Sequence, residues 1–212
     1  MLRRRNMLEQ SYLLFLLASV AVILIPGQDL VLVMTRGLSQ GSKAGLVTAA
    51  GVSVGLMGHT AIVSLGLGSI LLASAHAFLL LKLIGAAYLI YLGVRLLREK
   101  ELPDAEEARA TTATQLFFQG AVSNISNPKI TIFYIAYLPQ FLQAGTESPS
   151  IGLFVLGTTF ALLTFAIKAP VGWFAGFTTN WVRARPRVIR GVYICGGLTL
   201  LGLGVKLATE SR

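Results

Sequence analysis

The sequence has 212 residues, of which 54% are hydrophobic and only 13% are charged, whereas soluble domains carry about 25% charged residues. With a mean hydropathy of +0.71, this composition predicts a membrane protein. The formal charge of +9 lies at the edges of apolar segments, which favours membrane anchoring over nucleic-acid binding. A single cysteine, Cys195, excludes an internal disulfide and a cysteine-based metal cluster, and no metal or cofactor is expected.

Six apolar segments follow one another, and each is expected to form a membrane helix. They cover residues 12–34, 44–72, 77–97, 116–142, 151–177 and 188–208. The first is interrupted at Pro26-Gly27 and the fourth at Asn127-Pro128. A polar linker over 98–115 separates the first half, 1–97, from the second, 116–212. The predicted fold is therefore an all-α integral membrane protein with two three-segment halves, inserted in opposite senses as in an inverted repeat.

Charge placement predicts the orientation, because cytoplasmic loops retain Lys and Arg. The connections after segments one, three and five are basic, whereas those at 73–76 and 143–150 have no Lys or Arg. This places the carboxyl terminus outside. Arg3, Arg4 and Arg5 conflict with six simple crossings, which would put them outside as well. Segment one is either a broken span with an outward amino terminus, which we favour, or a re-entrant segment. A secretory signal peptide is a weaker alternative.

The first candidate site is Pro26-Gly27-Gln28-Asp29, within an otherwise apolar segment. Proline displaces the carbonyl four residues earlier, that of Val22, and glycine permits conformations that open a helix. Exposed backbone polarity at membrane depth is tolerated only in protein or beside a water-filled cavity, and an intramembrane carboxylate indicates function. The alternative is a break at the interface, with Asp29 as a helix cap.

The second candidate site is Asn124, Asn127, Pro128 and Lys129. The two asparagines share a helix face, and Pro128 displaces the Asn124 carbonyl. Asp29 and displaced carbonyls could accept hydrogen bonds from an amino-acid ammonium, while Lys129 and the amides could donate to its carboxylate. An Asp29 to Lys129 ion pair would serve this site. The alternative is a structural kink, with Lys129 extending to the cytoplasmic interface.

Two further polar residues lie inside apolar segments. His59 could relay protons in coupling, although a hydrogen bond between helices is the simpler interpretation. Lys168 could balance Asp29 or bind a carboxylate, or it could lie at the cytoplasmic edge of its helix. The pairs Gly51 with Gly55 and Gly172 with Gly176 have the spacing of close helix packing or of a homodimer face.

A set of short motifs accompanies these two sites, and together they resemble the LysE/RhtB family of exporters. The motifs are Pro26-Gly27 with Asp29, Leu38-Ser39-Gln40-Gly41, Ala44-Gly45, Lys82-Leu83, Gly85-Ala86-Ala87-Tyr88-Leu89, Tyr91-Leu92-Gly93, Phe118-Gln119-Gly120, Asn124, Asn127-Pro128-Lys129 and Leu138-Pro139-Gln140-Phe141. The resemblance covers roughly residues 13–142, and beyond them only the general hydropathy agrees.

This resemblance implies a multi-pass protein of the bacterial inner membrane that exports amino acids or their derivatives on a proton or ion gradient. The family usually has Pro-Gly-Pro at the first break, where this chain has Gln28. The branch that exports lysine and arginine carries an acidic residue shortly after the Asn-Pro, and residues 130–133 contain none. The resemblance therefore favours a neutral, threonine- or homoserine-like substrate, with basic amino acids or other small metabolites as the alternative.

Other functions remain as alternatives at this stage. An intramembrane serine protease would need Ser53 or Ser64 beside His59, and two histidines supply no zinc-protease motif. A membrane scaffold would not explain the two broken segments with Asp29 and Lys129 beside them. A passive channel is a third possibility, which export measured without a gradient would distinguish. We therefore expect a transporter and not an enzyme, with a small amino acid and the lipid bilayer as its partners.

Overall fold

The computed structural model describes residues 2–67, 75–98, 111–142, 148–175, 177, 181 and 184–209, and each regular element within them is helical. Segment one consists of α1 (Leu2–Leu24) and α2 (Gln28–Gln40). Segment two is α3 (Ser42–Ile62), which continues into a π-helical turn, η1 (Val63–Leu67). Segment three is α5 (Ala75–Arg98).

The second half of the chain follows the same pattern. Segment four consists of α6 (Ala113–Ile125), α7 (Pro128–Tyr137) and the 3-10 turn η2 (Leu138–Phe141). Segments five and six are α8 (Pro149–Trp173) and α10 (Pro186–Thr209). All six predicted segments are thus helical where they are described, and both predicted breaks are confirmed.

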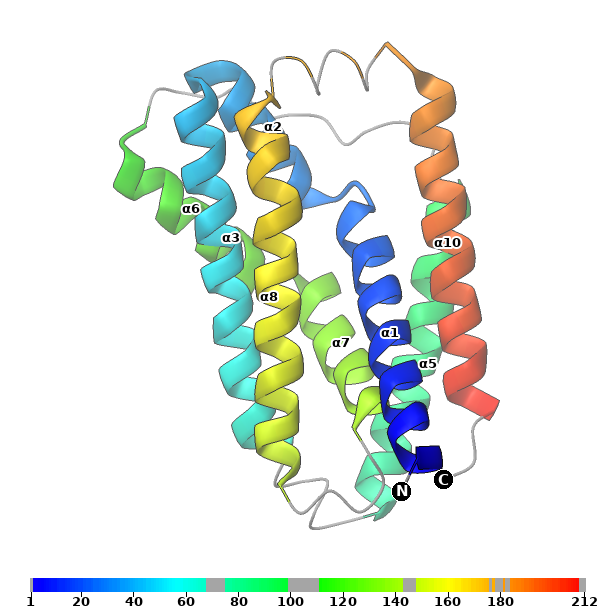
Figure 1. The fold of residues 1–212 in the computed structure, drawn as a ribbon. Coiled ribbons are helices and arrows are strands. Elements are labelled where there is room, and N and C mark those ends of the chain that lie inside the picture. The colour runs from blue at the N-terminus through cyan, green and yellow to red at the C-terminus, as the bar shows by residue number, and fades with distance from the viewer. Residues whose placement is uncertain are drawn as a thin grey trace.

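Within the described residues, two helices are long and apolar enough to cross a membrane, and a bent pair makes a third if it is a single span. Two are continuous, Ser42–Gly66 and Pro149–Trp173. The third is the pair Tyr12–Leu24 and Gln28–Gln40, which bends by 56° at its break. In Figure 1, α1 starts at the end of the bundle where both termini lie, and α2 ends at the opposite end.

The start of segment four differs from the prediction. The polar linker was expected to reach Gln115, but α6 begins at Ala113. The Thr112 hydroxyl accepts a hydrogen bond from the Gln115 amide, and the Gln115 side chain accepts one from the Thr112 amide. This capping box satisfies two amides that the helix would otherwise leave free. Residues 99–110 of the linker lie outside the described residues.

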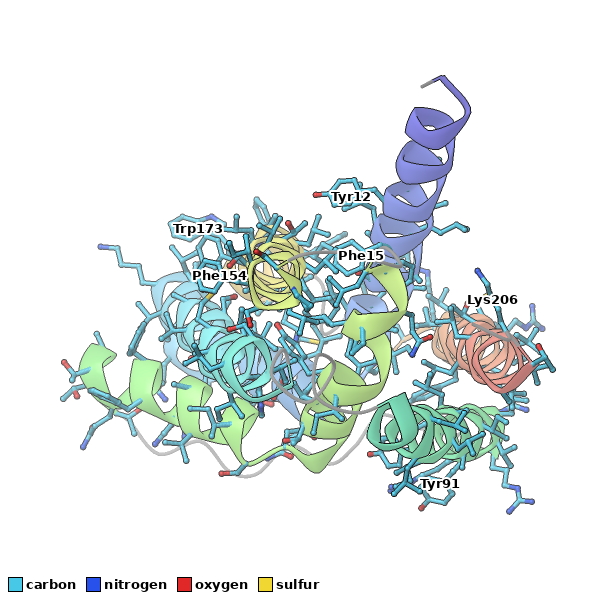
Figure 2. All side chains as sticks on the ribbon, turned by 90° about the horizontal axis from the view of Figure 1, so that it is seen from below. Tyr12, Phe15, Tyr91, Phe154, Trp173 and Lys206 are labelled. Atoms are coloured by element: carbon cyan, nitrogen blue, oxygen red, sulfur yellow. The ribbon has the colours of Figure 1, made fainter. Side chains whose placement is uncertain are left out.

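The molecule is apolar on its outside as well as in its core. Tyr91 and Phe154 project outward at the perimeter, as does Trp173, whereas Phe15 points into the bundle (Figure 2). Leu17, at 60% exposed, belongs to the same outward surface. Such a surface suits lipid rather than water.

Small residues bring the central helices together. An added Cβ at Gly51 would clash with the Phe117 carbonyl of α6, and one at Gly45 would clash with the Gly172 carbonyl of α8. Gly41 joins α2 to α3 with φ +88, a conformation that favours glycine. The predicted pair Gly51 and Gly55 therefore packs against α6 of the same chain, and Gly176 lies outside the described residues.

Candidate functional site

The first break places a carboxylate in the interior of the bundle. The Ile25 amide donates to the Val22 carbonyl at 3.3 Å, and Gly27 precedes α2 with an extended backbone. Gly27, and not Asp29, is the N-cap of α2, and it makes no side-chain capping hydrogen bond. Asp29 lies in the first turn and is 4% exposed. The expectation that Asp29 is the helix cap is therefore wrong.

Asp29 contacts the two other elements that form the site. The Nδ2 amide of Asn124, at the end of α6, donates to Asp29 Oδ2 at 2.7 Å, and Asn124 is 0% exposed. The Nζ of Lys168, in α8, lies 3.5 Å from the same oxygen. Lys168 is 6% exposed, which places its side chain in the core of the bundle. The cluster thus joins both halves of the chain through one buried ion pair.

The second break is supported by His59. Pro128 cannot donate to the carbonyl of Asn124, four residues earlier. His59 Nε2 lies 3.2 Å from that carbonyl oxygen, and because a carbonyl only accepts, Nε2 must carry the hydrogen. The His59 ring also contacts Tyr134, with centroids 5.6 Å apart. His59 therefore makes the predicted hydrogen bond between helices and holds the residue that binds Asp29.

A small cavity lies beside the ion pair. Its volume is about 30 Å³, enough for about one or two water molecules. Its polar lining comes from Gln28, Asp29, Asn124, Asn127, Thr164 and Lys168, and its apolar lining from residues including Val22, Ile25, Leu56, Ile130 and Phe160. Two buried acceptors at this point, Asp29 Oδ1 and Asn124 Oδ1, have no hydrogen-bond partner within the described residues.

The structure brings most of the predicted site residues together. Asp29, Asn124, Asn127 and Lys168 are buried at the cavity, whereas Gln28 lines it and is exposed. Asp29 pairs with Lys168, as one of the interpretations of Lys168 predicted, whereas the predicted pair of Asp29 with Lys129 falls outside the described residues. The side chain of Lys129, in the first turn of α7, lies outside the described residues, as does that of Pro128.

Sequence reasoning missed the apolar and hydroxyl lining that α8 contributes. Phe160, Thr164 and Lys168 are spaced four residues apart, so they lie on one face of α8. With Lys168 placed in the interior, this spacing would have predicted that Thr164 and Phe160 also line the site. The Thr164 hydroxyl donates to the Phe160 carbonyl at 2.8 Å.

The hydroxyls that a serine protease would need are engaged elsewhere. Ser53 donates to the Ala49 carbonyl and Ser64 to the Ala61 carbonyl, each within its own helix. Across the described part of the chain, no three His, Cys, Asp or Glu side chains are grouped so that they could hold a metal ion.

Comparison with known proteins gives a consistent family. A family described as LysE type translocator matches residues 20–211. A leucine efflux protein from Klebsiella pneumoniae is 26% identical, with 94% of this chain and 95% of that protein covered. Uncharacterized membrane proteins of Pseudomonas aeruginosa and Vibrio cholerae are 34% and 30% identical, covering 93% of this chain and 94% and 96% of their own lengths. No solved structure matches. The chain therefore belongs to the family of LysE type translocators.

Proposed function

We propose that this translocator exports neutral amino acids across the bacterial cytoplasmic membrane, driven by the proton gradient. The observation that carries the proposal is the buried group of Asp29, Asn124 and Lys168 between two broken helices, beside a cavity where two acceptors have no partner among the described residues. An ionisable group at membrane depth is costly and is expected at a transport site. The relative named as a leucine efflux protein supports the same class of substrate.

The cavity lining favours an aliphatic side chain. Leu56, Ile130 and Phe160 surround the polar group, and the Thr164 hydroxyl already donates to its own helix. Once the site opens, these apolar neighbours therefore favour a leucine-like solute over a threonine- or homoserine-like one, which is the second candidate. Lysine would place a second cation in apolar surroundings without a second carboxylate, which is unfavourable.

In the proposed cycle, Asp29 couples export to proton entry. A proton from outside reaches Asp29 as the amino acid leaves, and release of that proton to the cytoplasm restores the ion pair with Lys168. The two helix breaks permit the change of access, because neither α2 nor α6 is continuous with its partner helix.

The export assay uses everted membrane vesicles, whose lumen corresponds to the outside of the cell. We expect vesicles with an acidified lumen to accumulate labelled leucine above its external concentration, and threonine and lysine less. A protonophore should abolish accumulation, whereas a passive channel would only equilibrate leucine. Equal leucine levels in vesicles with and without the protein would contradict the proposed function.

For the architecture, we propose six crossings with both termini outside and two inverted halves, 1–97 and 116–212, joined by the linker 98–115. The Gln40 side chain accepts from the Thr111 amide at 2.9 Å, and Arg190 donates to the Leu97 carbonyl at 2.7 Å. These contacts support the placement of four helix ends on the same side of the bundle. They are the carboxyl ends of segments one and three and the amino ends of segments four and six. Basic residues also gather there, namely Arg36, Lys43, Arg95, Arg98, Arg185, Arg187 and Arg190.

A reporter enzyme that is active only outside the cytoplasm tests this orientation. Fused to either terminus, it should be active, because the basic end is expected to be cytoplasmic and both termini lie at the other end (Figure 1). A fusion within the linker, after Glu107, is the matched inactive control. If the amino-terminal fusion is inactive while the carboxyl-terminal one is active, segment one is re-entrant.

A further inference from the structure

We propose that the bound substrate separates the Asp29–Lys168 ion pair, so that each of its two charges binds one of these side chains. The substrate ammonium takes the place of the Lys168 ammonium at Asp29, and Lys168 then binds the substrate carboxylate. The substrate class is thus a free α-amino acid, with both charges required. This inference rests on the proposed function, and it assigns the carboxylate to Lys168 in place of the predicted Lys129.

The acceptors at the cavity match an ammonium group. Asp29 Oδ2 receives both the Asn124 amide and the Lys168 ammonium, while Asp29 Oδ1 and Asn124 Oδ1 receive no hydrogen bond from the described residues. An ammonium carries three donors and no acceptor. It can therefore engage both free oxygens and Oδ2 together, which the Lys168 ammonium at its observed position does not do.

Donors for a carboxylate lie at the same cavity. The 3.5 Å distance from Lys168 Nζ to Asp29 Oδ2 is longer than the roughly 2.7–2.9 Å of a strong charged hydrogen bond. Lys168 can therefore turn on its flexible stem from Asp29 to a substrate carboxylate, while the substrate ammonium replaces it at Asp29. The first backbone hydrogen bond of α2 runs from the Val31 amide to the Gly27 carbonyl, so the amides of Gln28 to Leu30 have no acceptor within the helix. These residues line the cavity, and free amides at a helix amino end favour an anion.

Charge balance favours a zwitterion over a molecule that carries only the ammonium or only the carboxylate. Asp29 and Lys168 together carry no net charge, and a bound amino acid adds none. An amine alone would leave a buried excess positive charge, and a carboxylate alone an excess negative charge, both of which are costly in apolar surroundings. Because the cavity holds only about one or two water molecules, the ion pair must open to admit the head group.

Ligand-induced thermal stabilisation of the purified protein tests binding without any requirement for transport. The ligands are leucine, isoamylamine and 4-methylpentanoate, which share one side chain and carry both charges, the ammonium only and the carboxylate only. For the wild type, we expect each half-analogue to bind about 100-fold more weakly than leucine. An amine that binds as well as leucine would overturn the inference.

Lys168→Met keeps the shape of the side chain and removes its charge. We expect leucine to bind at least about tenfold more weakly, and isoamylamine to bind more tightly than to the wild type, because Asp29 has lost its counter-ion. If Lys168 only stabilised the fold, both ligands would weaken together and their ratio would stay constant, which would also overturn the inference. Lys206→Met, at an exposed position of α10 (Figure 2), is the matched control and should bind like the wild type.

A second variant tests the inference if Lys168→Met alone folds poorly. Asp29→Asn combined with Lys168→Met removes both buried charges, and it should bind leucine and the two half-analogues with similar weak affinity. Retained preference for leucine in this variant would place zwitterion recognition elsewhere. If leucine binds as expected but is not accumulated by vesicles, the proposed function fails while the inference stands.

Discussion

Replacement of Asp29 by asparagine is expected to reduce leucine accumulation in everted vesicles to the level of vesicles without the protein. Asparagine has nearly the same shape, but it cannot carry the coupling proton at physiological pH. It also removes a charged partner of the substrate, and a hydrogen bond to a charged group contributes about 1.5–3 kcal/mol, or roughly a 10- to 150-fold change in affinity. Binding and coupling should therefore be lost together.

The comparison needs a check on folding, because Asp29→Asn leaves Lys168 without its buried counter-ion. Breaking such a pair costs about 3–5 kcal/mol, so accumulation is normalised to the amount of monodisperse protein. Glu107→Gln, the same kind of change in the polar linker, is the control and should accumulate leucine like the wild type. Wild-type accumulation by Asp29→Asn would rule out Asp29 as the coupling group.

Replacement of Gly51 by alanine is expected to cause the largest loss of stability from a single added methyl group. Its Cβ would meet the Phe117 carbonyl of α6, a backbone atom that cannot rotate aside. Overpacking of this kind costs about 1–3 kcal/mol or more. The separation of α3 from α6 would also displace Asn124 from Asp29.

The thermal midpoint of the detergent-solubilised protein measures this effect. Gly202→Ala is the matched control, because nothing lies within 4 Å of its added Cβ. It should be neutral or stabilising by up to about 1 kcal/mol from helix propensity. Equal midpoints for the two variants would show that the contact between α3 and α6 can relax.

The helical segments and their breaks could be predicted because both signals are local. Pro26-Gly27 and Asn127-Pro128 remove backbone hydrogen bonds wherever they occur in a helix. The start of α6 was placed three residues late because Thr112 and Gln115 were assigned to the linker, although their spacing is that of a capping box.

The sequence left two ion-pair partners open for Asp29, Lys129 and Lys168, and could not decide between them. A helix as uniformly apolar as α8 has no polar face that would fix its rotation, so Lys168 was equally compatible with an edge or the core. Its position depends on the contact between Gly172 and Gly45, which connects residues far apart in the chain. The same reasoning applies to His59, whose acceptor is a carbonyl 65 residues away.

The helices α2 and α6 are fastened to each other at both ends. Asp29 binds Asn124 at one end, and Gln40 binds Thr111 at the other, so the two 13-residue helices form a closed frame. A ligand that competes for Asp29 releases only the Asn124 contact and leaves the Gln40 contact about 17 Å away along α2, given a rise of about 1.5 Å per residue. Loss of the Asp29 contact alone would thus leave α2 and α6 joined through Gln40 and Thr111, with the break-side ends of both helices free to separate.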